Sequence, residues 1–162
     1  MSRLTVLLIL LISTLSACNK KQEEKDGRSY GSWTVNGKKY TARATERDTT
    51  INNTISLKLG DKNGNDEHML YIEFPPVFAI AGSYTLDASV AGSLKVHTYT
   101  FSATQQRFRE QYQNTNPAQS ININKTATVA GSNDRFNIAI PEITLYNSAG
   151  DSTVFSANIV DQ

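Results

Sequence analysis

The chain has 162 residues, a formal net charge of +1 and a single cysteine, and 39% of its residues are hydrophobic. The near-zero charge lacks the basic excess of a nucleic-acid-binding protein, so we expect no nucleic-acid partner. A single cysteine excludes an intramolecular disulfide, so a folded domain must depend on its apolar core. The length fits one domain of ordinary size.

Residues 1–17 have the three parts of a signal peptide. Arg3 gives a positive start, Leu4 to Ile12 form an apolar core, and Ser13 to Ala17 are mostly small. The apolar run is about half of the roughly 20 residues that a membrane-spanning helix needs, so a permanent transmembrane segment is not expected here.

The run Leu15-Ser16-Ala17-Cys18 resembles the lipobox of bacterial lipoproteins, and Cys18 is the chain's only cysteine. The resemblance implies that Cys18 carries a diacylglycerol and that acyl chains hold the protein on a membrane. The alternative is an ordinary secretory signal followed by an incidental cysteine, which the small residues before Cys18 disfavour. The next residue is Asn19 rather than Asp, which in the enterobacterial pattern favours the outer membrane, on its periplasmic or surface face.

Residues 18–29 comprise this cysteine and a polar segment, Asn19 to Ser29, which has no apolar residue and mixes both charge signs. Such a segment cannot bury enough surface to offset its ordering entropy, so we predict a flexible tether. Lys21, Glu23 and Glu24 resemble the export signal of surface lipoproteins in Bacteroidota, and a generic charged spacer explains them equally well.

Residues 30–162 are rich in Thr, Ile, Val, Tyr and Phe, in short alternating runs separated by Gly, Asn, Asp and Ser. This pattern is typical of an antiparallel all-β domain. We predict a β-sandwich or flattened barrel of about eight to ten strands. The clearest element is a hairpin in which Asn36-Gly37 forms a type I′ turn, so that Val35 faces Lys38 and Trp33 faces Tyr40.

Ile55 to Leu59 alternates cleanly, and we expect Met69 to Phe74 to be its partner strand. That second strand should end at Pro75-Pro76, because proline cannot donate to a ladder. We expect further strands where alternation recurs, at residues 82–86, 94–102 and 120–124, and in a last strand with Phe155, Ala157 and Ile159 inward.

Two segments depart from simple alternation. The apolar positions between Arg135 and Tyr146 change phase at Pro141-Glu142, which predicts a bulge or a break there. Gln105 to Gln113 fits one helical turn as well as a strand, and we interpret it as a mobile or edge segment.

The hairpin from Gly31 to Lys38, the segment from Ala81 to Leu86 and the turn from Ala149 to Ser152 together resemble small Bacteroidota envelope lipoproteins. In that group a single β domain has no assigned activity. The resemblance covers most of the mature chain, and it implies a fold and a location rather than a mechanism.

Aromatic residues gather in and beside the least regular segment, namely Tyr99, Phe101, Phe108 and Tyr112. They would suit a ligand surface, either a rim over a barrel mouth or a platform that stacks on a glycan. The alternative is that they belong to the core, as aromatic residues at strand spacing usually do.

The segment from Asp61 to Glu67 holds the polar cluster with the most specific pattern. Asp61, Asn63 and Asn65 match the first, third and fifth ligands of a calcium loop. The match then fails, since Asp66 stands where glycine is needed and Ile72 where a bidentate glutamate is needed. A hairpin connection with Asn63-Gly64 at its tip is the better interpretation.

Nothing in the sequence indicates catalysis. There are only two histidines, His68 and His97, and we find no nucleophile motif. The carboxylates show no spacing that implies a shared site, and no cofactor or other metal site is predicted.

The sequence therefore predicts a lipid-anchored, non-catalytic β domain of the cell envelope, a binding or accessory module for a glycan or an envelope partner. One alternative is a lipocalin-like carrier of a small apolar ligand, and another is a purely structural envelope component. An enclosed pocket would favour the carrier, whereas a filled core with an exposed aromatic strip would favour the module.

Replacing Cys18 with serine removes the thiol that would carry lipid. We expect the Cys18→Ser variant to move from the membrane fraction to the soluble fraction, because acyl chains supply about 0.8 kcal/mol for each buried methylene. Fractionation with immunoblotting measures the shift, with Ser16→Ala as the matched control. Retention of Cys18→Ser in the membrane fraction would contradict the anchor.

Overall fold

A computed structural model describes residues 29–49, 55–76, 81–115, 122–131 and 136–161 of the chain. These residues form eleven strands, all paired antiparallel, so the predicted all-β class is confirmed and the expected number of strands is exceeded. The predicted signal peptide, Cys18 and the predicted tether except Ser29 lie outside the described residues. The strands are β1 (Gly31–Val35), β2 (Lys38–Thr41), β3 (Ala44–Thr49), β4 (Ile55–Asn63), β5 (Asp66–Glu73), β6 (Gly82–Thr85), β7 (Lys95–Ser102), β8 (Arg107–Gln113), β9 (Thr126–Gly131), β10 (Phe136–Tyr146) and β11 (Ser152–Asp161).

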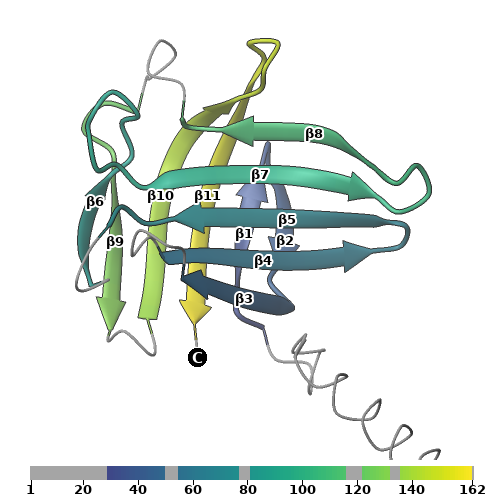
Figure 1. The fold of residues 1–162 in the computed structure, drawn as a ribbon, viewed down its shortest axis with the longest axis horizontal. Coiled ribbons are helices and arrows are strands. Elements are labelled where there is room, and N and C mark those ends of the chain that lie inside the picture. Colours follow the sequence, from purple (N-terminus) through teal and green to yellow (C-terminus); the bar gives the residue numbers. More distant parts are fainter. Residues whose placement is uncertain (1–28, 50–54, 77–80, 116–121, 132–135, 162) are drawn as a thin grey trace, which may run out of the picture.

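The strands form one continuous sheet in the order β2-β1-β11-β10-β8-β7-β5-β4-β3, and β6 and β9 extend it beside β10. The sheet curls over on itself, so that β3, β4, β5, β7 and β8 form a front layer (Figure 1). This front layer crosses a back layer of β1, β2, β9, β10 and β11. The arrangement agrees with the predicted sandwich or flattened barrel.

The first hairpin has the predicted register. Asn36 and Gly37 have φ angles of 48° and 77°, the left-handed values that a type I′ turn requires. Val35 pairs with Lys38 and Trp33 with Tyr40, and the Trp33 and Tyr40 rings stack with their centroids 5.5 Å apart. The turn therefore places Trp33 in the core, where it is 1% exposed.

Strand β10 joins the back layer to the front layer. Its first half pairs with β9, and its last residue, Tyr146, pairs with Gln113 of β8. The register shifts between Ile140 and Ile143, so the bulge predicted at Pro141-Glu142 is confirmed. The extra residue lets side chains of opposite parity face the same core. The core side chains of β10 are Ile138, Ile140, Ile143 and Leu145.

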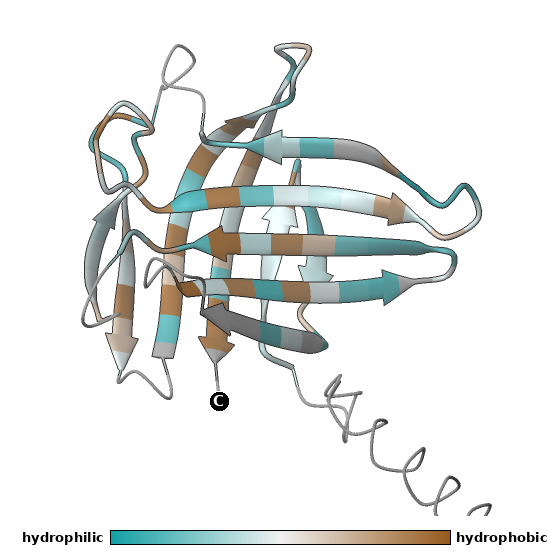
Figure 2. Ribbon diagram, in the orientation of Figure 1, coloured by the Kyte–Doolittle hydropathy of each residue, from teal (hydrophilic) through white to brown (hydrophobic). Residues whose placement is uncertain are grey.

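The space between the layers is filled by apolar side chains from both. Its largest fully buried members are Trp33 of β1, Phe74, which directly follows β5, and Phe155 of β11. Figure 2 shows the hydrophobic bands of β4 and β5 gathered toward the β9–β10 side, whereas the β4–β5 hairpin end is hydrophilic. The apolar side chains of both layers thus form one described core.

Three predictions about strands need correction or completion. The strand expected at residues 120–124 is wrong where the structure describes it: Lys125 N donates to Asn122 O at 3.0 Å and Asn124 has a φ of 61°, which makes a turn. Asparagine tolerates this conformation, and the strand, β9, begins only at Thr126.

The sequence also missed β3, which lacks apolar alternation and is held by its pairing with β4. Of the interpretations of residues 105–113, the edge strand is confirmed, because β8 pairs with β7 and meets β10 only at Gln113.

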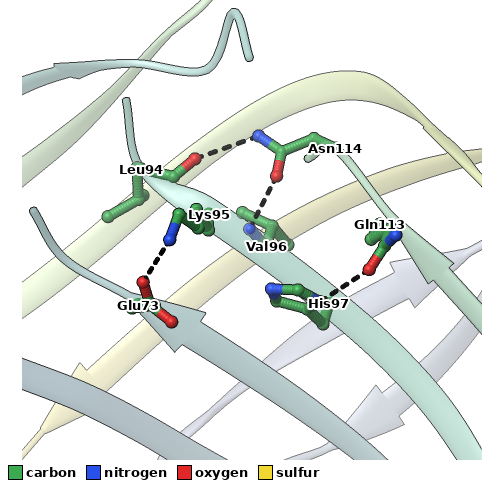
Figure 3. A network of polar contacts seen from close by, with 7 residues as sticks. All are labelled: Glu73, Leu94, Lys95, Val96, His97, Gln113 and Asn114. Carbon is green, nitrogen blue, oxygen red and sulfur yellow. Dashed lines mark hydrogen bonds and ion pairs between the residues drawn. The ribbon is translucent and has the colours of Figure 1, made fainter. Parts of the chain in front are cut away.

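Two buried asparagine side chains form hydrogen bonds with backbone groups that have no partner in a neighbouring strand. Asn114 is 6% exposed, and its Oδ1 accepts from Val96 N at 2.7 Å (Figure 3). Its Nδ2 donates to the carbonyl oxygens of Leu86 and Leu94, at 3.1 and 3.0 Å. Asn122 acts in the same way on the edge of β10, with bonds of 2.9 and 2.8 Å to the backbone N and O of Thr144. These amides satisfy buried backbone groups that the ladders leave open.

We expect Asn114→Ala to lower the free energy of unfolding by about 3 kcal/mol, because each buried polar group left without a partner costs about 1–3 kcal/mol. Urea denaturation followed by circular dichroism measures the change. Gln111→Ala, at an exposed position of β8, is the control and should change stability by less than about 0.5 kcal/mol. Equal stability of both variants would show that the Asn114 bonds contribute little.

Candidate binding surface

Five ring side chains lie on the outer face of the front layer, the face turned away from the core. They come from β5, β7 and β8. Leu70, Ile72 and Val96 of β5 and β7 are fully buried in the core, so the residues that alternate with them point to the outer face. We call these five residues the outer strip: Tyr71, His97, Tyr99, Phe101 and Phe108. Cross-strand pairing holds them together, with Tyr71 opposite His97 and Phe101 opposite Phe108.

A bulge in β8 puts Phe108 on this face. Thr100 pairs with Glu110, but Phe101 pairs with Phe108, so Arg109 is an extra residue on β8. Without that residue the two-residue period would turn Phe108 toward the inner face. The bulge is therefore the local feature that completes the outer strip.

Phe108 is the most exposed member of the outer strip. Its side chain is 60% exposed, although its ring makes edge contacts with Tyr99 and Phe101 at centroid distances of 5.1 and 5.4 Å. Tyr71 and His97 form a similar contact at 5.7 Å. The rings therefore hold one another in place while leaving apolar surface open to solvent.

The structure brings together three of the four aromatic residues that the sequence indicated as a ligand surface. Tyr99, Phe101 and Phe108 share the outer strip, whereas Tyr112 pairs with Thr98, on the inner face, and packs against the core. Tyr112 does not share the outer strip, because the register of β8 turns its side chain inward, and there it lines the pocket beside His68. The sequence did not indicate Tyr71, and strand parity alone could have added it.

Met69 is a buried residue on the same face as the outer strip. It lies on the outer face opposite Tyr99, yet it is only 6% exposed, so neighbouring side chains cover it. A buried methionine next to Tyr99 adds an apolar side chain to this face of the sheet. The outer face therefore has a small packed cluster of its own, separate from the core.

Charges of both signs lie around the outer strip, including Glu67 opposite Phe101 and Lys62 opposite Glu67. Lys95 Nζ forms an ion pair with Glu73, and Lys58 Nζ lies 3.7 Å from Glu46 Oε2. Exposed pairs of this kind contribute little to stability, about 0–1 kcal/mol. Their consequence here is electrostatic, since opposite charges beside the rings cancel.

His97 and Tyr99 present uncharged polar groups in the outer strip. Burial lowers the pKa of His97, and Lys95 acts in the same direction, while the bond to Gln113 Oε1 at 3.1 Å and the charge of Glu73 oppose the shift. Burial, followed by the nearby Glu67, raises the pKa of Tyr99. At neutral pH the imidazole is therefore neutral and the phenol keeps its proton.

His68 lies on the other face of the front layer, opposite Thr100, so the two histidines do not share a site. Its Nδ1 is 3.0 Å from Thr100 Oγ1, and its ring packs on Tyr40 at 4.4 Å. Burial, and then Lys38, lower the pKa of His68. The pocket beside it has a volume of about 30 Å³, room for water but far below the roughly 300–1,000 Å³ of a small-molecule site.

The candidate calcium segment is a tight hairpin. Strands β4 and β5 pair as far as Asn63 and Asp66, so the connection is Gly64-Asn65, one residue beyond the expected tip. Asp61 accepts a hydrogen bond from Thr41 N at 2.9 Å and lies 3.8 Å from Arg43 Nε. The Asp61 carboxylate therefore joins β4 to the end of β2 and to Arg43, which follows β2. Among the described residues, no group of three His, Cys, Asp or Glu side chains is placed to hold a metal ion.

Comparison with known proteins leaves the site to be interpreted from its geometry, since the chain matches no protein-family model, no curated protein and no solved structure. In the part of the chain that the structure describes, no helix has the length and hydropathy to span a bilayer.

The lowered pKa of His97 predicts how stability depends on pH. Above the unfolded pKa of about 6.5 both states are neutral; as pH falls below it, the unfolded state binds the proton first and stability decreases. His68 acts in the same direction. We therefore expect the urea concentration at the unfolding midpoint to decrease as the pH is lowered from about 7.5 to 5.5, and His97→Gln to make this decrease smaller. An unchanged slope in His97→Gln would contradict the assignment.

Proposed function

We propose that this protein is a lipid-anchored, non-catalytic module of the bacterial cell envelope that binds a glycan or an envelope protein on the outer strip. The observation that carries the proposal is Phe108, which is 60% exposed within a cluster of packed rings on the face opposite the core. Exposed large aromatic residues that are held in place on a sheet are typical of binding surfaces.

The filled interior supports binding outside the domain rather than within it. Trp33, Phe74 and Phe155 occupy the space between the layers, and each is at most 1% exposed. A carrier of a small apolar ligand needs an internal cavity, and the pocket near His68 has room only for water. We therefore favour the module over the carrier.

The proposed location follows from the resemblance of Leu15 to Cys18 to a lipobox. A lipid on Cys18 would hold the domain at the membrane, and a solvated segment from Asn19 to Ser29 would let the outer strip turn toward its partner. The module needs no cofactor for this task.

Crosslinking in intact cells tests the proposal. A benzophenone amino acid placed at Gln111, which lies opposite Tyr99 and is exposed, should capture the partner as a species of altered gel mobility. Combining this probe with Phe108→Ala should remove the captured species without changing the amount of protein, because the ring supplies the largest exposed apolar contact.

The matched control is the same probe at Val154, a 44% exposed residue of the back layer. Equal capture at Val154 and Gln111, or capture at Gln111 that survives Phe108→Ala, would overturn the proposed binding surface. Capture at Gln111 that does not depend on Phe108 is the result that a purely structural component would give.

A further inference from the structure

Resting on the proposed function, we infer that the outer strip binds an uncharged polysaccharide, along the face of its chain. The rings of the strip are the first reason. The apolar C–H faces of sugar rings pack on aromatic rings, and Phe108, Tyr99 and Phe101 present a cluster with centroids 5.1 to 5.4 Å apart.

Polar side chains beside these rings match the hydroxyl groups of a sugar. Gln111 is exposed opposite Tyr99, and Gln113 lies opposite His97 and bonds to its Nδ1 at 3.1 Å. Gln105 and Gln106 are exposed in the β7–β8 connection, which leads into β8 just before Phe108. Gln105 Oε1 accepts from Arg107 Nε at 3.0 Å, which orders this connection. Amides both donate and accept hydrogen bonds, as hydroxyl groups do, so one surface can serve many orientations of a sugar.

Charge argues for an uncharged chain. Beside the outer strip, Lys95 pairs with Glu73 and Lys58 with Glu46, and Glu67, opposite Phe101, faces Lys62 across β4 and β5, so no excess of positive charge gathers there. His97 adds no charge at neutral pH because burial lowers its pKa. An acidic polysaccharide would need an excess of cations here, and a neutral one does not.

The edge strand argues against an extended peptide as the occupant. A peptide that adds to a sheet needs a regular row of backbone groups along the edge strand. The extra residue at Arg109 interrupts that row in β8, a feature by which natural proteins protect their edges. The open surface is therefore made of side chains rather than of backbone.

Affinity electrophoresis tests the inference on the detergent-solubilised mature protein, in native gels that contain laminarin, dextran, galactomannan or soluble starch, with alginate and heparin as acidic probes. We expect at least one neutral polysaccharide to retard the protein, and the retardation to persist at about 0.5 M salt, where charge interactions are screened. Phe108→Ala should weaken the apparent affinity about tenfold, since stacking on one ring is of that order.

Two variants separate loss of binding from loss of structure. Phe108→Tyr keeps the ring and should keep the retardation, and Ile123→Ala removes a side chain of similar exposure, 62% against 60%, in the turn before β9. Retardation by the acidic probes alone, by none of the probes, or equally in Phe108→Ala would overturn the inference. If the Gln111 capture in cells still depends on Phe108, only the polysaccharide is wrong; if that dependence is also absent, the proposed function fails with it.

Discussion

The bulge of β10 is the constraint on which the two layers depend. Along a regular strand, Ile140 and Ile143 would face opposite sides of the sheet, and one of them would be lost from the core. The register shift between them lets both halves of β10 bury their apolar residues, while β9 pairs with the first half and β8 meets the last residue, Tyr146. The curled sheet can therefore enclose a single core.

Joining the layers in this way leaves few backbone groups without ladder partners, and side-chain amides complete the pairing. Asn114 and Asn122 lie where strands end or diverge, and each bonds to backbone N and O atoms of another segment. Because these groups are buried, each unmade bond would carry the full cost of desolvation. The junction between the two layers thus depends on two polar residues, which a search for apolar periodicity overlooks.

A filled interior also decides where chemistry can occur. Since Trp33, Phe74 and Phe155 occupy the centre, the binding that we propose is placed on an outer face, and the front layer has one with packed rings. The second bulge, at Arg109, determines that Phe108 belongs to that face. The bulge of β10 therefore turns Ile143 toward the core, and the bulge of β8 turns Phe108 toward the candidate binding surface.

Much of the fold was predictable, because local rules act on neighbouring residues. The Asn36-Gly37 turn and the phase change at Pro141 predicted a hairpin register and a bulge that the structure confirms. Strand β3 could not be predicted in this way, since it lacks apolar alternation and depends on pairing with β4. The run from Asn122 to Asn124 alternates without being a strand, because asparagine favours the turn that leads into β9.

By itself the sequence determined the all-β class, most of the inward residues and the aromatic residues Tyr99, Phe101 and Phe108 of the candidate surface. Only the tertiary structure decided that Tyr112 faces inward, that Tyr71 and His97 join the rings, and that the interior is filled. The physical reason is that alternation gives the relative parity of residues within one strand. Which parity faces the core is decided by register between strands, and a single extra residue such as Arg109 reverses it.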